Sequence, residues 1–228
     1  TLFSTGSLFA TDSNTLPIVP KPQQEMVTGE EITVGSHWKI YIDREATGSS
    51  TYMTELLKGC GVEPSITEQR NEANLILAID KKISKNREAY RISVSARGEI
   101  QVSATTRNGL LHALQTLRQL INCQANGITI PVCRIIDEPA FSWRAFMLDE
   151  SRHFHGMEMV KKLLDEMSYL KRNTFHWHLV DDPGWRIEIR KYPELTTIGS
   201  KRDFSHRELT PAQWDEQFPG KKMYYTQD

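Results

Sequence analysis

A buried strand that ends in two carboxylates constrains this chain more than any other feature. Residues 174–180 are rich in apolar side chains, and Asp181 and Asp182 follow them directly before a Pro-Gly break. A short apolar run that stops at a turn signal is typical of a buried strand. In parallel α/β sheets and barrels, ligands bind in the loops after the carboxyl ends of the strands. Asp181 and Asp182 are therefore candidate site residues.

The same pattern occurs once upstream, and a helix separates the two copies. Residues 143–149 form an apolar run with Arg144 at its entry and Asp149 at its exit. Apolar residues at three- and four-residue spacings then predict a helix, and they are Met157, Val160, Leu163, Leu164, Met167 and Leu170. Residues 144–182 thus predict a right-handed βαβ unit, with parallel strands and with both exit loops at one end of the sheet.

The first half of the chain contains a hairpin pattern instead. Residues 90–94 and 100–102 alternate between apolar and polar side chains on either side of an Arg-Gly turn at 97–98. This alternation predicts an antiparallel sheet with one solvent-exposed face. Thr106 can cap a following helix, at residues 107–121, whose leucine stripe would cover the other face.

The pattern changes at Asp137-Glu138-Pro139, and we place a domain boundary there. We predict an extended leader at residues 1–24, because this stretch is rich in Ser, Thr, Pro and Gln. An α+β domain with an antiparallel sheet covered by helices is expected at 25–137. Residues 138–228 then begin an α/β domain. This segment is too short to close a (β/α)8 barrel, since such barrels take about 250 residues.

Composition and charge exclude several classes of partner. The net charge is -1, so the chain offers no general attraction for nucleic acid or for anionic membranes. No apolar run is long enough to span a membrane, and the first residues lack the pattern of a secretion signal. A neutral ligand is the better expectation.

Three cysteines are too few for a disulfide framework. Cys123 and Cys133 flank Asn126-Gly127, a hairpin signal that would bring the two thiols near each other. Free, buried thiols are the commoner alternative. The cysteines therefore leave both the pairing and the compartment open, and the oligomeric state is open as well.

Several site residues have two readings. His176 and His178 share one face of the strand, so they fit either a divalent metal pair or histidines that support a site from behind. Asp181 and Asp182 fit either substrate orientation or a solvated turn. Trp185 could line a pocket or pack in a core. Arg144 could form a surface ion pair or donate to the hydroxyl groups of a ligand.

Two long motifs add a resemblance to a known family. The sequence Trp-Arg-Ala-Phe-Met-Leu-Asp-Glu-Ser-Arg-His-Phe at 143–154 and the sequence Phe-His-Trp-His-Leu-Val-Asp-Asp-Pro-Gly-Trp-Arg-Ile-Glu-Ile at 175–189 closely resemble the first two strand motifs of family 20 glycoside hydrolases, the β-N-acetylhexosaminidases. Residues 191–195 and 224–227 are also similar to that family. The α+β domain is similar in kind to the small domain that precedes the barrel in these enzymes.

The resemblance implies a (β/α)8 enzyme that removes terminal N-acetylglucosamine or N-acetylgalactosamine with retention of configuration. The nucleophile would be the acetamido oxygen of the substrate, an exception to the scheme with two carboxylates. The resemblance implies no metal and no organic cofactor. By motif match, Arg144 would hold sugar hydroxyls, His178 and Asp181 would support the acid, and Asp182 and Trp185 would contact the substrate, a glycan. A secreted, periplasmic or cell-surface location is also implied.

The chain departs from the family at the catalytic carboxylates. The family carries its Asp-Glu pair in a His-x-Gly-Gly-Asp-Glu motif on a later strand, and this sequence contains no Gly-Gly-Asp-Glu. Neither Asp137-Glu138 nor Asp149-Glu150 stands at the matching position. We therefore expect an amino-terminal portion of such an enzyme, inactive alone. The alternatives are a metal-dependent barrel hydrolase that uses His176 and His178, and a non-catalytic module associated with carbohydrate.

Overall fold

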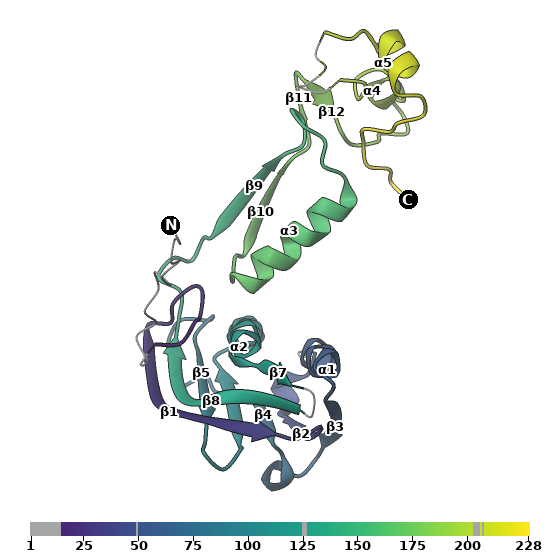
Figure 1. Cartoon of the computed structure of the whole chain (residues 1–228). Helices are drawn as coiled ribbons and strands as arrows, with labels where there is room; N and C mark the ends of the chain where they lie inside the picture. The colour runs from purple at the N-terminus through teal and green to yellow at the C-terminus, as the bar shows by residue number, and fades with distance from the viewer. Residues whose placement is uncertain (1–14, 49, 125–126, 203–205, 207) are drawn as a thin grey trace, which may run out of the picture. The chain divides into compact units, whose positions relative to one another are not determined.

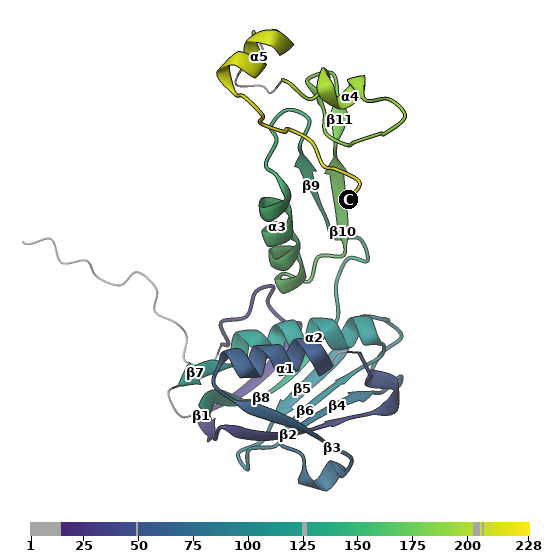
Figure 2. The same ribbon diagram turned by 90° about the vertical axis from the view of Figure 1, so that its right-hand side faces the viewer.

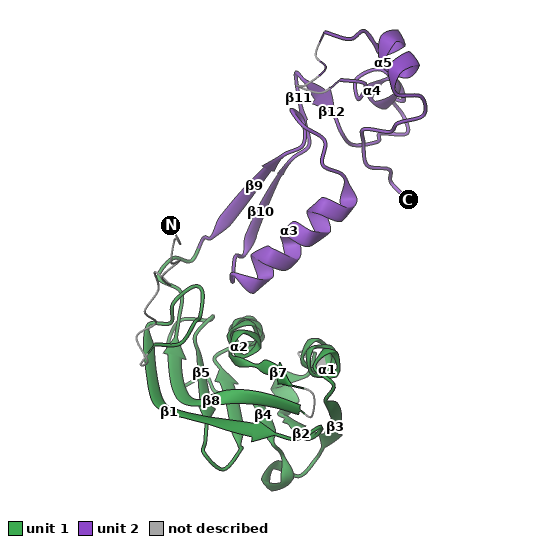
Figure 3. Cartoon of the chain, in the orientation of Figure 1, with its two compact units in different colours: residues 1–142 green, residues 143–228 purple. Residues whose placement is uncertain are grey.

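The computed structural model describes residues 15–228 except 49, 125–126, 203–205 and 207. These residues form two compact units, and the boundary between them along the chain falls between Ser142 and Trp143 (Figure 3). Most of the predicted leader, residues 1–14, lies outside the described residues. In the described remainder, Leu16 and Ile18 are buried in the core of the first unit, whereas most of the other residues up to Gln24 are exposed.

Unit 1 is a single twisted sheet with two helices on one face (Figures 1 and 2). The strand order is β1-β8-β5-β6-β4-β2-β3, and β7 pairs with β8. The strands are β1 (Gln24–Val34), β2 (His37–Ile42), β3 (Glu63–Thr67), β4 (Leu75–Ile79), β5 (Tyr90–Val94), β6 (Ile100–Ala104), β7 (Asn122–Gln124) and β8 (Gly127–Asp137). The helices are α1 (Ser50–Gly59) and α2 (Arg107–Leu120), with short 3-10 turns η1 (Arg44–Ala46) and η2 (Arg70–Glu72).

The sheet is mixed, which corrects the expectation of an antiparallel sheet. The predicted hairpin of β5 and β6 is confirmed, and β8 is antiparallel to both β1 and β5. In the other half of the sheet, β2 is parallel to β3 and β4, and β4 is parallel to β6. Parallel neighbours need long crossovers instead of tight turns. The connection through α1 supplies such a crossover between β2 and β3.

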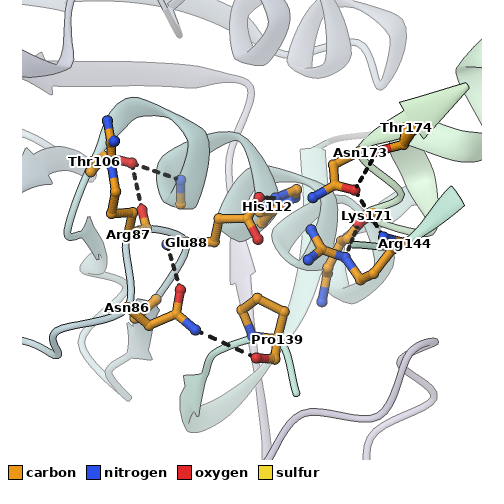
Figure 4. A network of polar contacts seen from close by, with 12 residues as sticks. Asn86, Arg87, Glu88, Thr106, His112, Pro139, Arg144, Lys171, Asn173 and Thr174 are labelled. Atoms are coloured by element: carbon orange, nitrogen blue, oxygen red, sulfur yellow. Dashed lines mark hydrogen bonds and ion pairs between the residues drawn. The ribbon is translucent and has the colours of Figure 1, made fainter. Parts of the chain in front are cut away.

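Helix α2 is confirmed, together with its cap. The Thr106 hydroxyl accepts a hydrogen bond from the Gly109 amide at 3.4 Å and donates to the Arg87 carbonyl (Figure 4). The stripe of Leu110, Leu114 and Leu117 is fully buried against the sheet. The predicted fold class is therefore confirmed: an α+β unit comes first, and the start of an α/β domain follows it.

One disulfide crosses unit 1, and it is a pairing that the sequence did not suggest. Cys60, just after α1, is bonded to Cys123 in β7. Cys133 is a free thiol buried in the core. The Cys123–Cys133 pairing that the sequence left open does not form, because β7 pairs with the start of β8, where Cys123 lies opposite Ile128. Cys133 lies five residues further along that strand, out of reach.

Unit 2 opens with the predicted strand, helix and strand. Strand β9 (Ala145–Asp149) is parallel to β10 (Thr174–His178), and α3 (Met157–Tyr169) connects them. Further elements follow along the chain, namely the antiparallel pair β11 (Val180–Asp181) and β12 (Gly184–Trp185), α4 (Glu194–Thr197) and α5 (Pro211–Gln217). Across the part of the chain that the structure describes, no helix is both long and apolar enough to cross a membrane.

Candidate active site

Four charged or ionisable side chains meet at the carboxyl ends of β9 and β10, and we call them the edge cluster: Asp149, Arg152, His178 and Asp181. Strand register places His178 opposite Asp149. The Arg152 guanidinium lies between two carboxylates, with NH1 2.9 Å from Asp149 Oδ2 and NH2 2.8 Å from Asp181 Oδ2. His178 Nε2 lies 3.4 Å from Asp181 Oδ2. The cluster therefore joins three segments of the chain at one edge.

The Arg152 cation helps to lower the pKa of both Asp149 and Asp181. Burial pushes the pKa of Asp149 up, but hydrogen bonds and charge from Arg152 outweigh it, so the pKa falls below its usual value. For Asp181, the largest effect is the hydrogen bond from the Asp182 amide, and Arg152 and His178 lower the pKa further. Both carboxylates are charged at neutral pH. Arg152 remains 45% exposed, so its guanidinium is open to a ligand.

A buried arginine fixes the loop that carries Arg152. The Arg186 side chain is fully buried and donates to the carbonyls of Glu150 at 3.0 Å and Ser151 at 2.9 Å. It also donates to the Ser200 carbonyl at 2.7 Å. Gly184 leaves room for this, because a Cβ there would lie 2.5 Å from the guanidinium. The residues that flank Arg152 are thus held by a network in which the buried charge is fully hydrogen-bonded.

Glu150 points away from its neighbour Asp149. Its side chain is fully buried, and Oε2 accepts a hydrogen bond from the His155 amide at 2.8 Å. Burial, together with the Glu150 charge, raises the pKa of the nearby Tyr225 hydroxyl. Asp149 and Glu150 therefore do not face a common ligand.

Arg144 does not join the edge cluster. It precedes β9, whereas Asp149 ends that strand, so the two lie at opposite ends of the sheet. Its amide donates to Asn173 Oδ1 at 3.0 Å, and its Nε donates to the Lys171 carbonyl at 2.7 Å (Figure 4). The expectation that Arg144 reaches across the site is not met, because a strand of five residues separates it from the exit loops.

The other predicted residues lie near the cluster with different exposure. Asp182 is exposed in the turn between β11 and β12, and its amide bonds the Asp181 carboxylate. Trp185 is partly buried, and its indole N–H donates to the Ile187 carbonyl at 2.7 Å. His176 is exposed, with its ring 6.0 Å from that of His178. Within the described ranges, no three Asp, Glu, His or Cys side chains are grouped to hold a metal.

Sequence reasoning brought His178 and Asp181 to the site but missed Arg152. The signal was present, because Arg152 follows Asp149 in the exit loop of a predicted strand, as Asp181 follows His178. Ligands bind in the loops after the carboxyl ends of parallel strands, and this applies to the loop after Asp149 as much as to the loop after His178. Arg144, the residue that the family resemblance indicates, stands at the entry of β9 and not at its exit.

Comparison with protein families covers almost all of the described chain. The model for glycosyl hydrolase family 20, domain 2, matches residues 15–138, and the model for the catalytic domain of the same family matches residues 141–228. The two matches follow one another in the order of units 1 and 2.

Similar proteins carry hexosaminidase names. A β-hexosaminidase of Vibrio furnissii is 37% identical over 195 residues, which is 85% of this chain and 31% of that protein. An inactive mutant of an exo-β-N-acetylglucosaminidase from Vibrio harveyi matches in structure with a TM-score of 0.75 and 32% identity, over 88% of this chain and 32% of that one. A mutant β-hexosaminidase of Streptomyces plicatus in complex with its product N-acetylglucosamine matches with a TM-score of 0.74 and 28% identity, over 94% of this chain and 43% of that one.

The chain spans about a third of the length of the first relative. Both units match models of the same family, and the similar sequences and similar structures carry names from that family. The chain belongs to glycosyl hydrolase family 20.

Proposed function

We propose that the chain supplies the amino-terminal part of a β-N-acetylhexosaminidase, an enzyme that removes terminal N-acetylglucosamine or N-acetylgalactosamine from glycans. One observation carries this proposal. The edge cluster places a fixed, half-exposed guanidinium and two charged carboxylates where βα enzymes bind their substrates, within a segment that matches the family's catalytic domain.

In this proposal Arg152 binds sugar hydroxyls. Asp149 and Asp181 contact the two terminal nitrogens of the guanidinium, and the side chain is still 45% exposed. A planar guanidinium with several donors can bind two neighbouring hydroxyl oxygens at once. His178 and Asp181 fix its orientation and support the acid, and Asp182 and Trp185 contact the substrate from the next loop.

The proposed reaction retains configuration and uses the substrate as its own nucleophile. The acetamido oxygen attacks the anomeric carbon while a carboxylic acid donates its proton to the leaving oxygen. The sequence lacks the Gly-Gly-Asp-Glu motif that supplies that acid in the family. We therefore propose that the 228-residue chain alone does not turn over substrate.

Hydrolysis of a nitrophenyl N-acetylglucosaminide tests both statements. We expect no nitrophenol release from the 228-residue chain, and release from a longer polypeptide that adds the later strands of a family 20 barrel. Arg152→Gln in the longer polypeptide should raise KM and lower kcat/KM by about tenfold or more, because a charge-assisted hydrogen bond is lost. Turnover by the short chain that survives both Glu150→Gln and Glu138→Gln would contradict the assignment of the acid.

We also propose a secreted, periplasmic or cell-surface location. The Cys60–Cys123 disulfide supports it, because disulfides persist mainly in oxidising compartments. The protein, taken from its native source, is denatured and alkylated before any reduction, and mass spectrometry of these 228 residues should then find one modified cysteine, Cys133. Three modified cysteines would contradict the proposal.

A further inference from the structure

A polar cavity is lined by residues of unit 1 alone. It has a volume of about 290 Å³, which is near the lower end for small-molecule sites, about 300–1,000 Å³. Its lining comes from the strands β4, β5 and β6 and from the ends of β2 and η2. No part of the edge cluster contributes to it.

Strand register shows that the cavity opens on the sheet face opposite α1 and α2. Residues that pair across neighbouring strands share a face. One row on this face contains Arg91, Ser103 and Ala78, and the next contains Ser93, Gln101 and Ile76. Their neighbours along β4, Leu75 and Leu77, alternate to the opposite face and belong to the core of unit 1. Helices α1 and α2 lie over one face of the sheet (Figure 2).

The floor of the cavity is apolar although this face is otherwise solvent-exposed. Ile76 is only 3% exposed, yet it does not belong to the core cluster under the helices. The neighbouring side chains of the cavity therefore bury it. The apolar surface left to a ligand is that of Ala78, which is partly exposed and lines the cavity together with Ile76. A small apolar floor between polar walls suits the C–H face of a sugar ring, which carries its hydroxyls at the edge.

The walls carry two cationic and two anionic side chains. Arg70 and Arg91 line the cavity together with Asp43 and Asp80. Arg91 Nε is buried and has no hydrogen-bond partner in the described part of the chain. A buried donor of this kind is costly unless a ligand or water satisfies it. The Arg70 guanidinium lies 5.8 Å from the centroid of the Tyr41 ring, which restrains its position.

The balance of charge selects the class of ligand. Two arginines and two aspartates sum to zero, so the cavity does not favour an anion or a cation. Each sugar hydroxyl both donates and accepts, and therefore matches a wall that combines guanidinium donors, carboxylate acceptors and the hydroxyls of Ser93 and Ser103. We propose that this cavity is a second carbohydrate-binding site, which holds one neutral sugar residue on unit 1.

The site does not depend on the proposed hydrolase activity, and its test uses binding by the whole 228-residue chain. The isotope-labelled protein is titrated with N-acetylglucosamine, N,N′-diacetylchitobiose, glucose and inorganic phosphate, and the backbone amide signals of Ser93, Gln101 and Ser103 are followed by NMR. We expect at least one neutral sugar to shift these signals in a saturable way, and phosphate to leave them in place.

Variants locate the binding. Arg91→Gln should weaken sugar binding about tenfold or more, because it removes a charge-assisted donor. Asp43→Asn provides a second, independent loss at the opposite wall. Arg134→Gln is the matched control, since Arg134 pairs with Ser93 and shares the face but does not line the cavity. The affinity of Arg134→Gln for the sugar should equal that of the original chain.

Failure of this site can be told apart from failure at the edge cluster. Arg152→Gln should leave the shifts in unit 1 unchanged, even if it abolishes shifts at Asp149 and Asp181. The proposal is overturned if no neutral sugar moves the three amides, if Arg91→Gln and Asp43→Asn both bind like the original chain, or if phosphate binds there more tightly than any sugar.

Discussion

At the scale of single residues, Arg152 shows how one side chain sets the chemistry of its neighbours. Its guanidinium contacts a carboxylate at the end of β9 and another in β11. Both carboxylates keep their charge to lower pH than an isolated aspartate, so the edge cluster stays charged through the neutral range. A ligand that replaces water here meets a fixed pattern of donors and acceptors.

Substitution Arg152→Gln tests this coupling. We expect the pKa of Asp149 and of Asp181 to rise toward the usual value, because the opposing charge is removed while burial still disfavours the anion at Asp149. Carbon-detected NMR titration of the two carboxyl groups measures it. Lys161→Gln, which removes an exposed cation from α3, is the control and should leave both pKa values unchanged.

The same substitution predicts a pH dependence of stability. Because the folded-state pKa of both aspartates is lowered, their stabilisation is present above the unfolded-state pKa of about 4 and is lost as the pH falls through the folded-state pKa. The original chain should therefore exceed Arg152→Gln in denaturant midpoint at pH 7, and the difference should shrink in acid. A difference that grows as the pH falls would refute the coupling.

Gly184 gives a second test at this scale. In Gly184→Ala the new Cβ meets the buried Arg186 guanidinium, which cannot move without breaking its bonds to several carbonyls. We expect a loss of stability of about 1–3 kcal/mol, as in other overpacked sites. Gly35→Ala is the control, since a Cβ there has no atom within 4 Å. Equal denaturant midpoints for the two variants would show that Gly184 is not needed for space.

At the scale of elements, helix α2 combines a local cap with a buried stripe. Thr106→Ala removes the side chain that accepts from Gly109 and bonds Arg87, and we expect a loss of about 1 kcal/mol. Thr106→Ser keeps the hydroxyl and should retain most of that stability. Hydrogen exchange of the α2 amides measures both variants. If the α2 amides exchange as fast in Thr106→Ser as in Thr106→Ala, the stability comes from the methyl group of Thr106 and not from its capping hydroxyl.

The elements that the sequence predicted well are those with local signals. The period of α2, its Thr106 cap and the alternation of the hairpin lie within short windows, and all three are confirmed. The parallel pairing of β2 with β4 has no such signal, because strand order depends on crossovers. Arg152 was missed for a related reason. Its partner Asp181 lies beyond a whole helix in sequence, and only the fold brings the two together.

At the scale of the whole chain, the two units differ in how fully their surfaces are covered. Unit 1 buries a continuous core between its sheet and helices. In unit 2, the two-stranded parallel sheet leaves large apolar side chains exposed, including Phe146 and Met147 in β9. Parallel strands are normally covered on both faces. This contrast agrees with the proposal that further barrel strands belong beside β9 and β10.

The Cys60–Cys123 bond links positions 63 residues apart within unit 1, and its removal gives the last prediction. Closing a loop of this length restricts the unfolded chain, so Cys60→Ala with Cys123→Ala should lose roughly 4 kcal/mol by the loop-entropy relation. Denaturant unfolding measures the loss. The original chain in reducing buffer is the control, and it should unfold at nearly the same midpoint as the double variant. If the oxidised chain unfolds at the same denaturant midpoint as the reduced chain and the double variant, the disulfide does not stabilise the fold.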